Sequence, residues 1–101
     1  GYTTFIFAAR NRQVEVLRNV SKIFNNMIDI NSQNNDGNTA LMFAVQNPNV
    51  DVIKYMFKRF KHYIDINKQN ADGNTALMLA IQKSNFEAIK IICEILANKV
   101  D

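Results

Sequence analysis

The sequence contains one histidine, His62, and one cysteine, Cys93, the residue types that most often supply metal ligands or nucleophiles. No cysteine or carboxylate motif at ligand spacing surrounds His62, so a metal site has nothing from which to be built. We expect His62 to lie on the surface near a helix end. Cys93 falls on an apolar helical stripe, which predicts a buried, unreactive thiol. No metal and no cofactor are therefore expected.

The sequence also lacks the motifs that carry enzymatic catalysis. It has no glycine-rich phosphate loop, no nucleophile elbow and no pair of carboxylates on one helical face. We therefore predict that the protein is not an enzyme and has no small-molecule substrate.

One basic run is interleaved with aromatic residues, and it is the remaining candidate for chemistry. The run consists of Lys54, Lys58, Arg59 and Lys61, with Tyr55, Phe57, Phe60 and Tyr63 between and after them. Basic side chains contact phosphates and aromatic rings stack on bases, so a nucleic-acid or anionic-surface contact through residues 54–61 is one interpretation. Phe57 and Phe60, however, belong to an apolar stripe, which favours the simpler interpretation that the lysines cover a solvated helix face.

Composition sets broad limits on the kind of protein. The chain has 101 residues, 48% of them hydrophobic, a formal net charge of +3 and a pI near 9.2. This charge is well short of the basic stripe of a dedicated nucleic-acid binder. No apolar run approaches the roughly 20 residues that a membrane-spanning helix needs. We expect no membrane insertion, and an intracellular, cytoplasmic location.

A repeat organises the whole sequence. Residues 36–46 (DGNTALMFAVQ) recur at residues 72–82 (DGNTALMLAIQ), and the step from Gly37 to Gly73 is 36 residues. One step back lies Gly1, which opens a degenerate third copy. A period of this size is typical of repeat architectures, in which each unit buries its apolar face against the next.

Two helices are predicted in each unit. Apolar residues of the first helix recur at i, i+3 and i+4, as in Phe5, Ala8 and Ala9, then Leu41, Ala44 and Val45, then Leu77, Ala80 and Ile81. Thr39 and Thr75 are placed to cap the start of this helix. The second helix carries longer stripes, namely Leu17, Val20 and Phe24, then Ile53, Met56, Phe57 and Phe60, then Ile89, Ile92, Cys93 and Leu96. The Asp-Gly pairs at 36–37 and 72–73 predict a hairpin-like loop before each repeated first helix.

This unit resembles the ankyrin repeat family. The resembling segments are Asn35–Ala44 (NDGNTALMFA) and Ala71–Ala80 (ADGNTALMLA), with Asp-Ile-Asn at 29–31 and again at 65–67. The resemblance implies an all-α, ankyrin-like solenoid of three helix-turn-helix units with projecting hairpin loops. The units would be 1–34, 35–70 and 71–101, forming a single array that we expect to be part of a longer one.

Two departures from the family pattern have structural consequences. Thr-Ala-Leu-Met stands where the family has Thr-Pro-Leu-His, which replaces a polar link between units by adaptable methionine packing. The period also exceeds the family's usual length of about 33 residues. Alignment places the extra residues at 61–63, and at 25–27 in the first unit. We expect them to lengthen the second helix or to form a bulged connection after it.

The family resemblance implies protein binding through a concave groove lined by loop tips and first helices. By position-by-position resemblance, the predicted contact residues are Tyr2, Arg10, Asn11, Gln33, Asn35, Asn38, Gln46, Asn47, Gln69, Ala71, Asn74, Gln82 and Lys83. Most of them are uncharged carboxamides, which offer donors and acceptors to another chain. The alternatives are the anionic contact through residues 54–61 and a purely structural spacer in a larger assembly.

Overall fold

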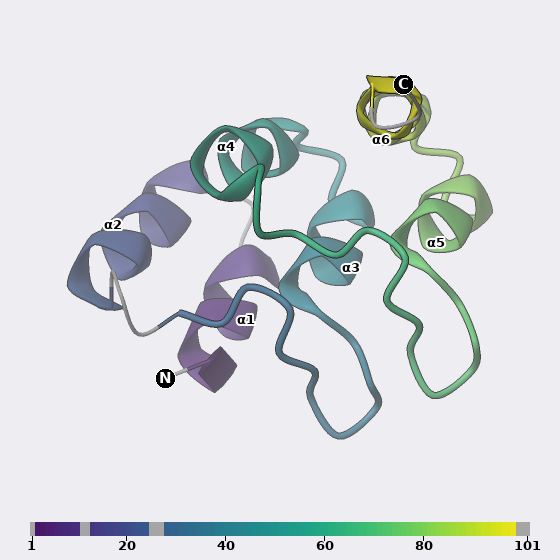
Figure 1. Ribbon diagram of the computed structural model, residues 1–101. Helices are drawn as coiled ribbons and strands as arrows, with labels where there is room; N and C mark the ends of the chain where they lie inside the picture. Colours follow the sequence, from purple (N-terminus) through teal and green to yellow (C-terminus); the bar gives the residue numbers. More distant parts are fainter. Residues whose placement is uncertain (1, 11–12, 25–27, 99–101) are drawn as a thin grey trace.

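The structure, a computed structural model, describes residues 2–10, 13–24 and 28–98. This part of the chain has no strand and forms six helices: α1 (Tyr2–Arg10), α2 (Val14–Phe24), α3 (Ala40–Val45), α4 (Asp51–Phe60), α5 (Ala76–Gln82) and α6 (Phe86–Asn98). Figure 1 shows α1, α3 and α5 in one row and α2, α4 and α6 in a second row, with two long loops projecting on one side. The predicted all-α solenoid is confirmed.

The repeated first helices begin at the predicted threonines. The Thr39 hydroxyl accepts a hydrogen bond from the Met42 backbone N–H at 3.3 Å, and Thr75 accepts from Met78 at the same distance. The Thr39 N–H also donates to the Met42 sulfur at 3.4 Å. Met42 therefore closes a reciprocal cap on α3 in addition to packing in the core.

The stripe on the first helices forms the centre of the core in the first two units, whereas in the last unit Ala80 is buried and Leu77 is half-buried. Leu41, Ala44 and Val45 are buried in α3, which packs against both α1 and α5. The expectation that Ile81 joins the same stripe is wrong, since its side chain is 56% exposed whereas Val45 is fully buried. In the described chain no helix pair packs on the side of α5 away from α3, so Ile81 has no neighbour there.

The second helices show the same difference between the middle and last units. The predicted stripe of α4 is buried, and the Phe60 ring meets the Phe5 ring edge to face at 5.6 Å. The prediction that Cys93 is buried is wrong, because the thiol is exposed. Its repeat equivalent, Phe57, is buried in a helix that packs against both α2 and α3, whereas α6 packs chiefly on α5.

Residues 61–63 do not extend α4. The helix ends at Phe60, and the backbone N–H groups of Tyr63 and Ile64 both donate to the Phe60 carbonyl, at 2.9 and 3.2 Å. The bulged connection is therefore the correct one of the two alternatives. Residues 25–27, the corresponding insertion in the first unit, lie outside the described residues.

The two long loops are narrow hairpins of the same geometry. Asn34 exchanges backbone hydrogen bonds with the segment at Gly37 and Asn38, and its side-chain oxygen also accepts from the Asn38 N–H at 2.9 Å. Asn70 does the same in the second loop. Gly37 and Gly73 have φ near +80°, a conformation that glycine adopts readily, which explains the glycine at each tip.

Candidate protein-binding surface

Two of the carboxamides predicted to contact a partner, Gln33 and Asn38, form hydrogen bonds that join one loop to the next. The Gln33 side-chain nitrogen donates to the carbonyls of Gly37 and Gln69, both at 2.8 Å. The Asn38 side-chain oxygen accepts from the Asn70 amide at 3.0 Å. Side-chain hydrogen bonds thus join the second loop to the first, and Gln33 and Asn38, both half-buried, contribute to the stacking of the units.

Asn47 also has an internal role. Its side chain is only 5% exposed, and its amide oxygen accepts from the Asn49 N–H at 2.9 Å in the turn before α4. The Asn85 amide one unit later donates to the Val45 carbonyl at 2.8 Å and to the Asn47 carbonyl at 3.2 Å. These contacts join the turn of the second unit to the turn of the third, so Asn47 stabilises the array.

Three hollows lie beside the first helices and share lining residues, so that they form one depression along the array. The first, of about 250 Å³, is lined by Ile6, Phe7, Arg10 and residues 34–36. The second, of about 310 Å³, is lined by Arg10, Phe43 and residues 46–48. The third, of about 490 Å³, is lined by Gln46, Pro48, Val50 and residues 83–87. We call the joined hollows the inner groove.

Arg10 lies where the first two hollows meet. Its guanidinium carbon is 5.7 Å from the centre of the Phe7 ring and 5.0 Å from that of the Phe43 ring. A cation held over aromatic faces gains attraction from the ring quadrupoles. Arg10 therefore links a residue of α1 to a residue of α3, and its guanidinium is held at the middle of the inner groove.

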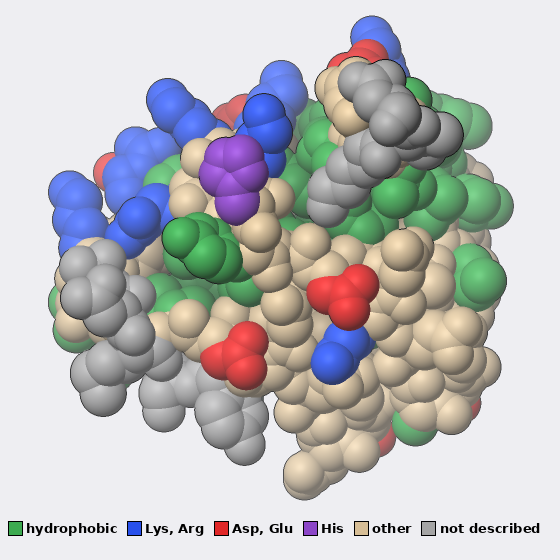
Figure 2. Space-filling view, viewed as in Figure 1, with side chains coloured by type: hydrophobic (Ala, Val, Ile, Leu, Met, Phe, Trp, Pro, Cys, Tyr) green, Lys and Arg blue, Asp and Glu red, His purple; other side chains and the backbone are tan. Residues whose placement is uncertain are grey.

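The remaining predicted contact residues divide by position. Arg10, Asn35, Gln46 and Lys83 line the inner groove, whereas Gln69, Ala71 and Gln82 are exposed elsewhere on the loops and at the end of α5. Asn74 lies half-buried at the base of the second hairpin, where its N–H donates to Asn70 at 2.9 Å. The Tyr2 side chain and Asn11 lie outside the described part of the chain. Figure 2 shows few charged side chains over the loops.

Sequence reasoning missed the apolar residues of the inner groove. Phe7 is 63% exposed and Phe86 is 77% exposed, and Phe43 and Pro48 also line the hollows. A signal was present, because Phe7 and Phe43 occupy the same repeat position and lie outside the helical stripes. An aromatic residue kept off the buried face is a candidate for contact with a partner.

A further hollow lies outside the inner groove, at the carboxyl end of α4. Its volume is about 590 Å³, and its lining consists of residues 28–31 with Arg59, Phe60 and Tyr63. The bulge at residues 61–63 contributes Tyr63 to this lining, so the residues that lengthen the period also shape this hollow. Asn31 in its wall is already bonded to the backbone of Tyr63 and Asp65, at 2.8 and 2.7 Å.

The described residues contain no group of three His, Cys, Asp or Glu side chains placed to hold a metal ion. His62 is exposed just beyond the end of α4, as predicted. Among the described helices, none combines the length and the apolar character that crossing a membrane would require.

Comparisons with known proteins agree with this geometry. Residues 5–101 match the family of ankyrin repeats in three copies. No curated protein sequence matches. A chain in the structure of the predatory endopeptidase Bd0816 from Bdellovibrio bacteriovorus with immunity protein Bd3460 superposes with a TM-score of 0.79 at 24% identity. A chain in the structure of yeast ribosomal protein Rps3 with its chaperone Yar1 has a TM-score of 0.74, also at 24% identity.

The two solved chains are longer than this one. The superpositions cover 91% and 86% of the present chain, but only 45% of the first solved chain and 61% of the second. The likeness therefore establishes the fold of the repeat array.

Proposed function

The chain belongs to the ankyrin repeat family, and from this membership we propose that it is a non-catalytic module that binds another protein through the inner groove. Ankyrin repeats are in general protein-interaction modules. The two solved structures named above are of protein complexes, which supports a protein as the partner here. We also propose that units 1–34, 35–70 and 71–101 act as one continuous array.

The position of Arg10 over Phe7 and Phe43 is the observation that carries this proposal. Arginine and aromatic residues are the types most enriched at the centres of protein interfaces. Here they are already held together, so little side-chain freedom is lost when a partner binds. Gln46 and Lys83 continue the inner groove toward α6 and add polar groups at its edge.

A crosslinking experiment tests for a partner at this surface. Replacement of Lys83, which is exposed and lines the third hollow of the inner groove, by the photoreactive residue benzoylphenylalanine should yield a covalent adduct with a partner protein in cell extract. Asn19 is exposed on α2, which contributes nothing to the inner groove, and the same replacement there should not trap that protein. If no adduct forms at Lys83, the alternative of a purely structural spacer is favoured instead.

Variants of the groove then test the contact itself. Gln46→Arg and Gln82→Arg place a bulky charge at the groove and at the adjacent end of α5, and each should weaken binding of the trapped partner more than about tenfold. Asn19→Arg makes the same change of charge on α2 and should bind normally. Circular dichroism should show unchanged helicity in all three variants. Normal binding by both glutamine variants would mean that the inner groove is the wrong surface.

A further inference from the structure

The outer row of helices carries a repeated pattern of charge that the proposed function does not use. Arg18, Lys54 and Lys90 occupy one repeat position, each 36 residues from the next. Lys22 and Lys58 occupy a second position, one helical turn further along. Because stacked units bring equivalent residues side by side, the basic run of the second unit becomes part of a two-dimensional array of cations.

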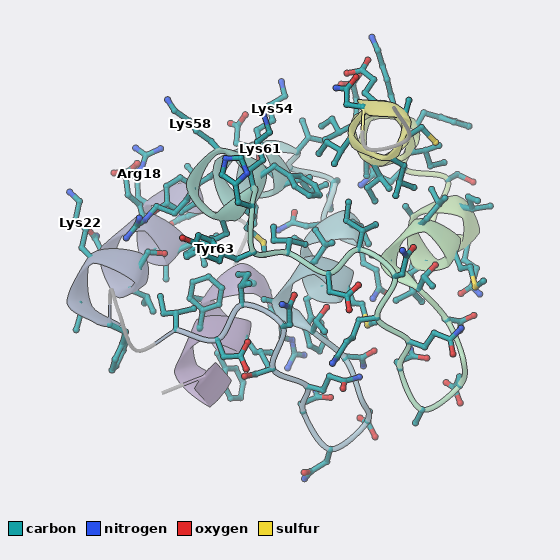
Figure 3. All side chains as sticks on the ribbon, viewed as in Figure 1. Arg18, Lys22, Lys54, Lys58, Lys61 and Tyr63 are labelled. Carbon is teal, nitrogen blue, oxygen red and sulfur yellow. The ribbon has the colours of Figure 1, made fainter. Side chains whose placement is uncertain are left out.

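The described side chains form this array on one surface. Figure 3 shows Arg18 and Lys22 of α2, Lys54 and Lys58 of α4, and Lys61 just after α4 on the same side of the molecule, away from the hairpin loops. Figure 2 shows the lysine and arginine side chains gathered over these helices. We call this surface the basic face, and it consists of Arg18, Lys22, Lys54, Lys58 and Lys61.

Helix geometry places these charges close enough to act together. Residues four apart lie about 6 Å from one another along a helix, and packed helices such as α2 and α4 have axes about 8–10 Å apart. These spacings are near the Debye length at physiological salt, which is about 8 Å, so the potentials of neighbouring cations add.

The cations are only slightly neutralised within the chain. Arg18 pairs with Glu15 at 2.9 Å and is still 43% exposed, while its guanidinium lies 5.3 Å from the centre of the Tyr55 ring on α4. Within the described residues, Lys54 and Lys58 have no carboxylate at ion-pair distance, and both are exposed. The basic face therefore presents positive charge to the solvent.

A row of carboxylates limits the width of what can bind there. Glu15, Asp51 and Glu87 also share a repeat position, and all are exposed in the first turns of α2, α4 and α6, where the helix dipole favours them. They precede the row of Arg18 and Lys54 by three residues, or about 4.5 Å along the helix. A duplex or a membrane surface would cover both rows and meet repulsion at the carboxylates. A narrow strand can instead lie along Lys22 and Lys58, which are seven residues, or about 10.5 Å along the helix, from Glu15 and Asp51.

The aromatic residues near the basic face give no platform for bases. Phe57 and Phe60 are buried, and the Tyr55 ring is half-buried with Arg18 over it. Tyr63 is 72% exposed, but Figure 3 shows it below α4, apart from the labelled lysines. Binding of single-stranded nucleic acid depends on stacking of bases on exposed rings. An extended polypeptide needs no such stacking, and its carboxylates can reach cations on successive helices.

We propose that the basic face binds an extended acidic segment of a partner polypeptide, which runs across α2 and α4 with Lys54 and Lys58 at its centre. This contact is separate from the inner groove, so a partner could occupy both surfaces or either one.

A defined probe tests this proposal without knowledge of the natural partner. The probe is a fluorescein-labelled oligo-glutamate of about ten residues, which extends to roughly 33 Å, close to the 32 Å length of the molecule. In about 50 mM salt, where exposed charges are less screened than at physiological strength, its fluorescence anisotropy should rise on titration with the protein. Lys58→Glu should weaken this binding about fivefold to tenfold.

The matched control is Lys68→Glu, which makes the same change of net charge on the loop between α4 and α5. It should leave the affinity for the peptide unchanged. The proposal is overturned if Lys68→Glu weakens binding as much as Lys58→Glu, if the peptide does not bind, or if a single-stranded oligothymidylate of equal charge binds more tightly. The last outcome would identify a nucleic-acid surface instead.

A separate substitution tests whether the row of carboxylates formed by Glu15, Asp51 and Glu87, the acidic row, limits what can bind. Asp51→Asn removes a carboxylate beside the basic face, and it should strengthen binding of duplex DNA or anionic vesicles more than binding of the oligo-glutamate. If Asp51→Asn strengthens all three probes equally, the acidic row does not select for a narrow ligand and the proposal is wrong on that point.

Discussion

Gln33 and Gln69 occupy the same position in successive repeats, and the side-chain amide of Gln33 donates to the backbone carbonyl of Gln69 at 2.8 Å. The same nitrogen donates to the Gly37 carbonyl, also at 2.8 Å, so one side chain supports its own hairpin and the next one. A glutamine at this repeat position therefore links its own unit to the next one by a hydrogen bond, provided that a further unit follows.

The first prediction compares these two glutamines. Gln33→Ala should lower the free energy of unfolding by about 1 kcal/mol, because hydrogen bonds to two carbonyls are lost. Gln69→Ala is the matched control; its side chain is exposed and has no recorded hydrogen bond among the described residues, so the change should stay within about 0.5 kcal/mol. Urea unfolding followed by circular dichroism measures both. Equal losses would show that the link between loops adds nothing.

The second prediction concerns the two hairpin glycines. Gly37 and Gly73 have φ of +79° and +80°, so alanine at either position should cost about 1–2 kcal/mol through backbone strain. At Gly37 the new Cβ would also lie 2.7 Å from the Ala71 backbone nitrogen, which donates to the Asp36 carbonyl at 3.0 Å. At Gly73 it would meet nothing within 4 Å.

Gly37→Ala should therefore destabilise the protein more than Gly73→Ala, as measured by the urea midpoint of each variant. A larger loss at Gly73 would contradict the close approach of the two loop tips.

The third prediction compares the two repeated methionines. Met42 is 1% exposed and its sulfur accepts from the Thr39 N–H, so Met42→Ala should cost about 2–5 kcal/mol. Met78 is 44% exposed, and Met78→Ala should change stability by less than about 1 kcal/mol. Thermal and urea unfolding of both variants provide the measurement. A costly Met78→Ala substitution would mean that a neighbour covers the outer side of α5 in solution.

The fourth prediction concerns the single cysteine. Because the Cys93 thiol is exposed, Ellman's reagent should titrate one thiol per chain under native conditions, without denaturant. Cys93→Ser should abolish the signal and leave the unfolding curve almost unchanged. If the thiol reacts only after urea is added, the Cys93 side chain is buried in the folded protein and this prediction is wrong.

Much of the fold could be predicted from the period and from local chemistry. Thr39 and Thr75 mark the starts of helices because a threonine hydroxyl can bond the free N–H groups of a first turn. The glycines at the loop tips and the apolar stripes predict the hairpins and the helix pairs. These features depend on residues close together in the sequence, so the sequence contains the information for them.

The candidate site was predicted only in part. Four of the predicted contact residues, Arg10, Asn35, Gln46 and Lys83, line the inner groove, and their role in binding remains a prediction. The sequence offers no means to separate them from Asn47, which also borders the second hollow but is only 5% exposed. An asparagine has the same chemistry in both settings, and only its neighbours decide whether its amide faces the chain or the solvent.

The sequence by itself determined the repeat, the starts of the repeated first helices and the family of the fold. Only the tertiary structure decided which of two equivalent residues is buried, as for Met42 and Met78 or Val45 and Ile81. The physical reason is that helix formation depends on neighbours along the chain, which repeat every 36 residues. Burial depends on neighbours in space, and these differ between a unit packed on both sides and a unit packed on one.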